Sequence, residues 1–281
     1  MSCLQSGETL REWCESAPYW EKHSATIRTM FAPVTRALIE DAGIRGGQSV
    51  LDVAGGPGEP SLTIAETVGP NGSVTCTDAV AEMVYAARRE ARRRGIKNIS
   101  FHQCNADSLP FDNDSFDAVV SRLGAMFFPE PLAALREMLR VTKLGGAVAL
   151  AVWHKSELNP FSYVVTEVIS RYVESPPADP DAPSAFRFAE LGKLATNLRN
   201  AGAIDIHERV LEFHIEAPIS IEEFWEMRSE ISESLREKLA TLSSEQQMQA
   251  AREVKEAVRG FFPNKQTRFP AQMIVLKGQK P

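Results

Sequence analysis

A glycine-rich segment at residues 54–58 is the first place where this chain could hold a ligand against its backbone. It reads Ala54-Gly55-Gly56-Pro57-Gly58, after the apolar run 50–53 and before the apolar, helix-compatible run 62–68. Glycine lacks a Cβ and tolerates positive φ, so the backbone can approach a ligand closely. A helix N-terminus adds oriented N–H groups. The pattern predicts a turn that binds a nucleotide-like ligand.

Two carboxylates follow the next two strand-like segments. Asp78 lies twenty residues beyond Gly58 and closes the run 74–77, and Asp107 follows the run 99–103. A carboxylate at the first of these positions can accept hydrogen bonds from both hydroxyls of a bound ribose. A dinucleotide fold would also want a third glycine after Gly56 and Gly58, and Ser61 stands there instead.

Alternating strands and helices must position these residues. The sequence predicts strands at 50–53, 74–77, 99–103, 116–121 and 148–152, with helices at 61–68, 82–94 and 131–141 between them. We expect Gly145-Gly146 to turn the chain into the last of these strands. The alternation indicates βαβ units and a doubly wound sheet. Ligands then bind beyond the carboxyl ends of the strands, where the glycine segment and both carboxylates lie.

The remainder is predicted to complete the sheet and to cover it. Residues 8–43 are expected to be helical with interruptions at Pro18 and Pro33, and a further helix is expected at 188–201. Strands are expected at 204–215 and 271–277, separated by a helical insertion with an apolar stripe. The predicted division is an N-terminal helical lid at 1–45, a core at 46–155, a loop, helix and strand at 156–219, a helical cap at 220–262 and a final strand at 263–281.

Composition narrows the class of protein. The formal net charge of -6 argues against a nucleic-acid-binding surface, and no apolar run is long enough to span a membrane. The first eight residues lack the basic start and apolar core of a signal peptide. There is no Cys-x-x-Cys pair and no ligand spacing among the histidines, so no metal site is expected. These features together favour a protein of the reducing cytoplasm.

The ordered motifs resemble a known family. The segments are Val50–Gly58, Asp78, Asn105–Phe111, Phe116–Val120 and Leu144-Gly145-Gly146. Together they are similar to class I S-adenosylmethionine-dependent methyltransferases, and most of all to the ubiquinone/menaquinone-biosynthesis (methyltransferase type 11) branch. The resemblance implies a Rossmann-like α/β fold, doubly wound, with a mostly parallel seven-stranded sheet, helices on both faces and a helical cap. It also implies S-adenosyl-L-methionine as the cofactor.

The resemblance assigns roles to individual residues. Gly55, Gly56 and Gly58 would line the methionine part of the cofactor, and Asp52 would support that loop and the cofactor's ammonium group. Asp78 would hold the ribose hydroxyls. Asp107, with the backbone of Ala106, would contact the adenine amino group. The other residues expected to bind the cofactor are Ala54, Ala79, Met83, Ser108, Arg122, Leu123 and Trp20.

Methyl transfer is an in-line displacement, so much of the catalysis can come from alignment in a dry pocket. A general base is needed only if the acceptor must lose a proton. His154 and Glu157 follow the fifth strand and are the nearest candidates, although an exposed histidine and a solvated acid without a role would fit the same positions. Trp153, Tyr163 and Phe128 could shape the acceptor site. The expected acceptor is a small organic molecule, with quinone-like, phenolic or lipid-like compounds slightly favoured.

Two other functions fit parts of the pattern. An NAD(P)-dependent oxidoreductase would share the turn and the ribose carboxylate, but the third glycine and a Tyr-x-x-x-Lys pair are missing. A noncatalytic S-adenosylmethionine-binding protein would keep the loop and transfer no methyl group. The apolar stripe at 224–242 is read as the core of the cap or as the contact of a homodimer.

Overall fold

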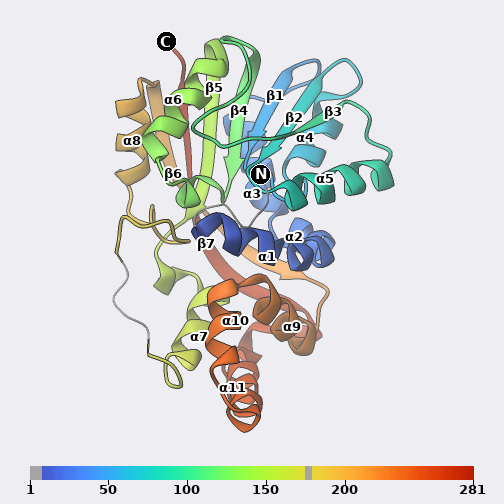
Figure 1. Ribbon diagram of the computed structural model, residues 1–281, viewed down its shortest axis with the longest axis vertical. Coiled ribbons are helices and arrows are strands. Elements are labelled where there is room, and N and C mark those ends of the chain that lie inside the picture. The colour runs from blue at the N-terminus through green and yellow to red at the C-terminus, as the bar shows by residue number, and fades with distance from the viewer. Residues whose placement is uncertain (1–7, 175–178) are drawn as a thin grey trace.

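A single seven-stranded sheet organises the chain (Figure 1). The computed structural model describes residues 8–174 and 179–281. The strands lie in the order β3-β2-β1-β4-β5-β7-β6. Their bounds are β1 Ser49–Val53, β2 Ser73–Asp78, β3 Ile99–Gln103, β4 Phe116–Arg122, β5 Thr142–Trp153, β6 Ile204–Ala217 and β7 Thr267–Gln279.

The register confirms the predicted doubly wound, mostly parallel fold. Strands β1 to β5 pair in parallel, and β7 inserts antiparallel between β5 and β6. The first strand pairs with β2 on one side and β4 on the other, so the winding reverses between β1 and β4. Ligands of such sheets bind beyond the carboxyl ends of the strands at this reversal.

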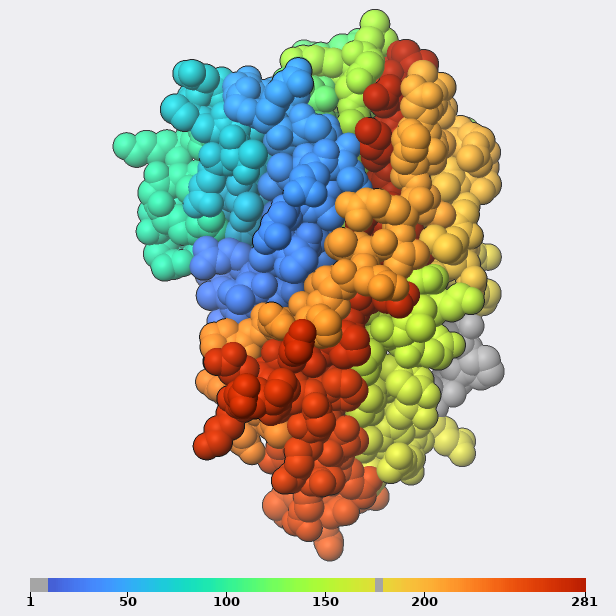
Figure 2. All heavy atoms as spheres, turned by 180° about the vertical axis from the view of Figure 1, so that it is seen from behind, coloured from blue at the N-terminus to red at the C-terminus, as the bar shows by residue number. Residues whose placement is uncertain are grey.

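Helices cover both faces of the sheet. On the face seen from behind, α3 (Ala32–Asp41) and α4 (Ser61–Val68) form the blue surface of Figure 2. Helices α6 (Pro131–Val141) and α8 (Lys193–Ala201) contact each other on the opposite face, and α5 (Ala81–Arg94) packs on β2 and β3. The central strands are apolar and buried, as expected for a parallel sheet covered on both sides.

A helical layer lies beyond one end of the sheet (Figure 1). It contains α7 (Pro160–Ile169), α9 (Ile221–Ile231), α10 (Glu233–Ala240) and α11 (Ser244–Ala257). Helices α1 (Glu8–Lys22) and α2 (Ser24–Met30) lie between this layer and the sheet. Short 3-10 turns are found at Ala125–Phe127, Ser156–Leu158, Arg259–Phe261 and Pro263–Lys265.

Aromatic side chains join the helical layer to the sheet. Phe269 of β7 lies 5.2 Å from Phe224 of α9 and 5.6 Å from Phe161 of α7, measured between ring centroids. Both Phe224 and Phe269 are fully buried. The long strands β6 and β7 reach beyond the other strands into this layer, and Figure 2 shows β6 in orange crossing from one part to the other.

Some predicted boundaries were wrong. Pro18 lies inside α1, and the N-terminal helices break at His23 and Phe31 instead. The helix expected at 188–201 begins only at Lys193, because Gly192 adopts a φ of 82° and ends the preceding turns. The insertion forms three helices, two of them opened by capping boxes at Ser220 and Ser243.

The sequence predicts a turn at Gly145-Gly146 before the fifth strand, but both glycines lie inside β5. Gly145 has a φ of 71°, and the pairing of β5 with β4 shifts register between Phe116 and Ala118. The N–H of Gly145 donates to the carbonyl of Lys280 at 3.0 Å. A neighbouring strand end therefore keeps this irregular segment within the sheet.

The described residues include no helix long and apolar enough to cross a membrane. Residues 1–7, which carry most of the expectation about a signal peptide, lie outside the described ranges. Cys76 and Cys104 are free thiols.

Candidate functional site

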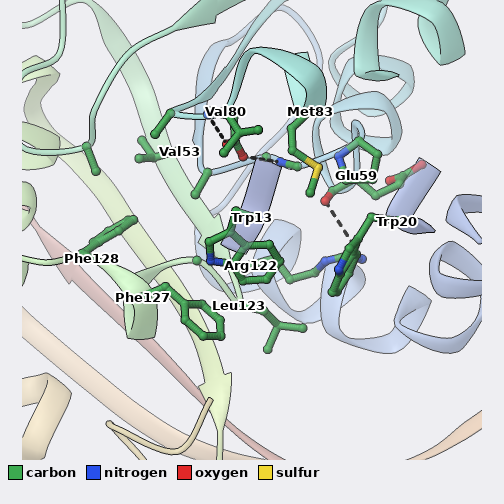
Figure 3. A pocket seen from close by; sticks show the side chains of 18 of the residues that line it. Trp13, Trp20, Val53, Glu59, Val80, Met83, Arg122, Leu123, Phe127 and Phe128 are labelled. Carbon is green, nitrogen blue, oxygen red and sulfur yellow. Dashed lines mark hydrogen bonds between the residues drawn. The ribbon is translucent and has the colours of Figure 1, made fainter. Parts of the chain in front are cut away.

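A cavity of about 230 Å³ opens at the carboxyl ends of β1, β2, β3 and β4. Its walls come from the segments that follow these four strands, and from α1 and α2 on the opposite side (Figure 3). The lining is mostly apolar, with Asp78, Asp107, Glu59 and Arg122 among its charged members. It therefore lies where the winding of the sheet reverses, as the topology predicts.

Two strained residues mark the ends of β1 and β4. Ala54 has a φ of 59° and Leu123 a φ of 63°, both in the left-handed region that non-glycine residues rarely adopt. Between them, a Cβ on Gly124 would lie 2.6 Å from the Cβ of Ala54. Only glycine allows this approach, and it brings the two strand ends together on the cavity wall.

Asp52 lies directly beneath the glycine-rich loop. Its Oδ2 accepts a hydrogen bond from the Ser61 hydroxyl at 2.5 Å, and its Oδ1 has no partner in the described part of the chain. A Cβ on Gly55 would lie 2.8 Å from Oδ2 and 2.7 Å from the Cys76 sulfur. Burial raises the pKa of Asp52 to about 7. Asp52 thus supports the loop from below and is not part of the cavity wall.

Asp78 faces the cavity at the end of β2. One carboxylate oxygen accepts the N–H of Gly56 and the other that of Val80, each at 2.9 Å. Burial raises the pKa of Asp78 to about 6, although the backbone N–H donors favour the charged form. The carboxylate connects the glycine loop to the start of α5 and still lines the cavity.

The segment after β3 forms another part of the wall. The N–H of Cys104 donates to the carbonyl of Asp78 at 3.1 Å, which joins this segment to β2. Asn105, Ala106 and Asp107 follow along the cavity, and the Asp107 side chain is exposed. This arrangement leaves backbone and carboxylate groups open to a ligand.

Arg122 brings a buried positive charge to the site. Its Nη1 donates to the hydroxyl of Thr35 at 2.8 Å, and its Nη2 donates to the backbone carbonyl of Glu59 at 3.1 Å. The side chain is 9% exposed, and burial lowers the pKa of Arg122. The carboxylate of Glu59 is paired with Arg94 at 2.5 Å. The cation is therefore fixed by neutral oxygen atoms.

Aromatic residues line the cavity on the side of α1. Trp13 of α1 packs edge-on against Phe127 at 4.9 Å and lies 5.7 Å from Trp20. The indole N–H of Trp20 donates to the carbonyl of Ile231 in α9 at 3.2 Å. Phe128 also lines the cavity. Rings of this kind can cover flat ligands and shield a positive group.

Most of the residues expected to bind the cofactor meet in this cavity. Those in its wall are Trp20, Ala54, Gly55, Gly56, Asp78, Ala79, Met83, Ala106, Asp107, Arg122 and Leu123. Asp52, Gly58 and Ser108 are outside the wall. Gly58 instead allows close packing, because its Cβ would lie 2.9 Å from a methyl group of Leu62.

The two expected general bases are not part of this wall either. His154 was read as an exposed loop residue, but it is 8% exposed and its Nδ1 lies 2.7 Å from the carbonyl oxygen of Ala189. Glu157 is exposed in a 3-10 turn. Of the three residues expected to shape the acceptor site, only Phe128 lines the cavity. Trp153 packs edge-on against Phe31 at 5.8 Å.

Sequence reasoning missed several members of the wall. Arg28 of α2, Glu59 of the glycine loop and Phe127 of the turn after β4 all line the cavity. Position after a strand end could have indicated Glu59 and Phe127. No local signal marks Arg28, because its place depends on how α2 packs across the site.

Comparison with known proteins agrees with this geometry. Residues 33–172 match the ubiE/COQ5 methyltransferase family. Over 130 residues the chain is 38% identical to the ubiquinone/menaquinone biosynthesis C-methyltransferase UbiE of Proteus mirabilis, which covers 46% of this chain and 52% of that protein. The chain thus spans about half the length of this relative.

Solved structures share the fold. A SAM-dependent methyltransferase from Aquifex aeolicus is 21% identical, with a TM-score of 0.52 over 70% of this chain and 91% of that chain. Phosphoethanolamine N-methyltransferase 2 of Haemonchus contortus, solved with S-adenosyl-L-methionine, is 17% identical, with a TM-score of 0.55 over 93% of this chain and 57% of that chain. At these identities the likeness establishes the fold alone.

Proposed function

We propose that this chain, whose residues 33–172 belong to the ubiE/COQ5 methyltransferase family, binds S-adenosylmethionine and transfers its methyl group to a small organic acceptor. The observation that carries the proposal is the meeting of Gly55, Gly56, Asp78 and Asp107 in one cavity at the reversal of the sheet. They lie at the carboxyl ends of three strands, β1, β2 and β3, and they would hold the amino-acid, ribose and adenine parts of the cofactor respectively.

The residues present fit this cofactor. The loop at Gly55 has no space for a side chain above Asp52 and Cys76, so its backbone would be the surface that meets the ligand. The carboxylate of Asp78 would hold the ribose hydroxyls, and Asp107 with the backbone of Ala106 would hold the adenine amino group. S-adenosylmethionine, when bound, supplies a methyl group on a positively charged sulfur. Trp13 and Trp20 would keep water away from it.

The acceptor would enter on the aromatic side of the cavity. Trp13, Phe127 and Phe128 offer apolar surface there, which supports a quinone-like, phenolic or lipid-like acceptor. His154 and Glu157 lie outside this wall, so we assign neither to proton transfer. Catalysis would then rest on alignment of the acceptor with the methyl group and on exclusion of water. Cytoplasmic location and homodimer formation remain predictions.

The proposal is tested with methyl-labelled S-adenosylmethionine and a panel of phenols, quinones, amines and thiols. We expect label in at least one acceptor with the wild-type protein, and at least about 100-fold less with Asp78→Ala at the same cofactor concentration. Binding without transfer to any acceptor would favour the noncatalytic alternative. Binding of NADH in place of S-adenosylmethionine would favour an oxidoreductase.

A further inference from the structure

Arg122 is a buried cation without an anionic partner in the described part of the chain. Its two hydrogen-bond acceptors are the hydroxyl of Thr35 and the backbone carbonyl of Glu59, both neutral. Its Nε is fully buried and has no acceptor. No carboxylate of the described residues lies within 4.0 Å of the guanidinium, although Asp52 and Glu59 act on it from farther away.

Such an arrangement costs free energy in the protein alone. A charged group that loses water without gaining a counterion is strongly disfavoured. Burial lowers the pKa of Arg122, because the loss of hydration disfavours the charged form. The cation packs 6.0 Å from the centre of the Phe31 ring, which compensates only part of the lost hydration. The fold therefore retains a positive charge that a ligand could pair.

The position of Arg122 indicates which ligand group would meet it. The side chain lines the cavity and reaches from the end of β4 to the carbonyl of Glu59 in the glycine loop (Figure 3). This is the loop proposed to hold the amino-acid end of S-adenosylmethionine. That end carries one anionic group, the α-carboxylate, and the adenosyl part carries none.

We propose that Arg122 binds the α-carboxylate of the methionyl group and so makes the site selective for cofactors that carry it. The inference rests on the proposed function and extends it to the charge recognition of the cofactor. A guanidinium suits a carboxylate because its donors form a planar fork, and pairing would give the buried charge its missing counterion. Fixation by Thr35 and Glu59 holds the fork in place before the ligand arrives.

The test compares two ligands that differ only in this group. S-adenosylhomocysteine carries the carboxylate, and S-adenosyl-3-thiopropylamine keeps the ammonium group but lacks the carboxylate. For the wild type we expect calorimetry to show binding of the first about 10- to 100-fold tighter than of the second. For Arg122→Met we expect the two affinities to agree within about 3-fold, through loss of S-adenosylhomocysteine affinity alone.

Arg228→Met is the matched control, because the Nε of Arg228 is also buried without an acceptor in the described part of the chain, but Arg228 is not part of the cavity wall. It should keep the preference of the wild type. If Arg122→Met retains the preference, or if Arg228→Met loses it, the assignment is wrong. Unchanged binding of the amine ligand shows that the pocket of Arg122→Met is folded. Failure of the wild type to bind S-adenosylhomocysteine would instead contradict the proposed function itself.

Discussion

The Asp78 side chain has two roles, because it both holds the glycine loop and faces the cavity. Its carboxylate accepts two backbone N–H groups, from Gly56 and Val80, while lining the cavity. We expect Asp78→Ala to weaken S-adenosylhomocysteine binding by at least about 100-fold, since both a ribose acceptor and the loop geometry are lost. Loss of these two hydrogen bonds should also lower the free energy of unfolding by about 1–3 kcal/mol.

Calorimetry and urea unfolding measure these two effects separately. Asp107→Ala serves as a comparison, because its exposed side chain makes no such loop contacts and should leave the free energy of unfolding within about 0.5 kcal/mol of wild type. An Asp78→Ala protein that binds S-adenosylhomocysteine with wild-type affinity would remove this carboxylate from the site.

Asp52 should make stability depend on pH. Its pKa rises from an ordinary value of 3.8 to about 7 on burial, so the folded protein binds more protons than the unfolded chain between these values. The free energy of unfolding should therefore fall as pH rises through this window. Relative to Asp52→Asn, which cannot titrate, the wild type should lose about 2 kcal/mol between pH 5 and pH 8.

Urea unfolding of both proteins at pH 5, 6.5 and 8 tests this. Asp117→Asn is the control with opposite sign, because hydrogen bonds from Lys143 and Ser49 outweigh the effect of burial and lower the pKa of Asp117. The stability that the charged Asp117 contributes is lost only as the pH falls toward that lowered pKa. The difference in the free energy of unfolding between Asp117→Asn and wild type should therefore stay constant from pH 5 to pH 8. If the difference in the free energy of unfolding between Asp52→Asn and wild type is also constant, Asp52 is charged over the whole range from pH 5 to pH 8.

At the scale of elements, α1 and α2 are fastened over the cavity by the helical layer. Glu230 of α9 accepts from Lys22 at 2.8 Å and lies 2.6 Å from His23, at the junction of the two helices. We expect Glu230→Gln to release S-adenosylhomocysteine about 3- to 10-fold faster, because the lid would open more often. Stopped-flow tryptophan fluorescence, with Trp13 and Trp20 in the wall, reports the release rate.

Glu226→Gln is the control for the lid. Glu226 pairs with the same Lys22 at 2.6 Å, but its side chain is 54% exposed and it makes no contact with His23. Because solvent screens this ion pair, Glu226→Gln should change the release rate by less than about 2-fold. Equal release rates from Glu230→Gln and wild type would show that opening of these helices does not limit release.

The sheet was predictable from sequence where local signals agree. Helices at 61–68 and 131–141 and the strand at 99–103 have the predicted bounds, because glycine turns, apolar periodicity and proline at a helix start all act locally. The positions of other residues depend on tertiary packing. His154 is buried, with its Nδ1 beside a carbonyl oxygen 35 residues away in the sequence, and Arg28 reaches the cavity only through the docking of α2. Neither could be read from neighbouring residues.

At the scale of the whole molecule, sheet, lid and helical layer should be stabilised together by ligand. A ligand that binds only the folded state adds about 2.7 kcal/mol at one hundred times its dissociation constant. For a chain of this size we expect S-adenosylhomocysteine to raise the Tm by about 5–10 °C. Differential scanning calorimetry measures the shift, and NADH at the same concentration should leave the Tm unchanged.

A calorimetric titration of the wild-type protein with S-adenosylhomocysteine tests the central claim most directly, because it asks whether the cavity at the ends of β1 to β4 is a cofactor site. We predict one binding event per chain with a dissociation constant of about 1–100 μM, abolished in that range by Asp78→Ala. No heat of binding at millimolar ligand, or equal binding by the variant, would contradict the account.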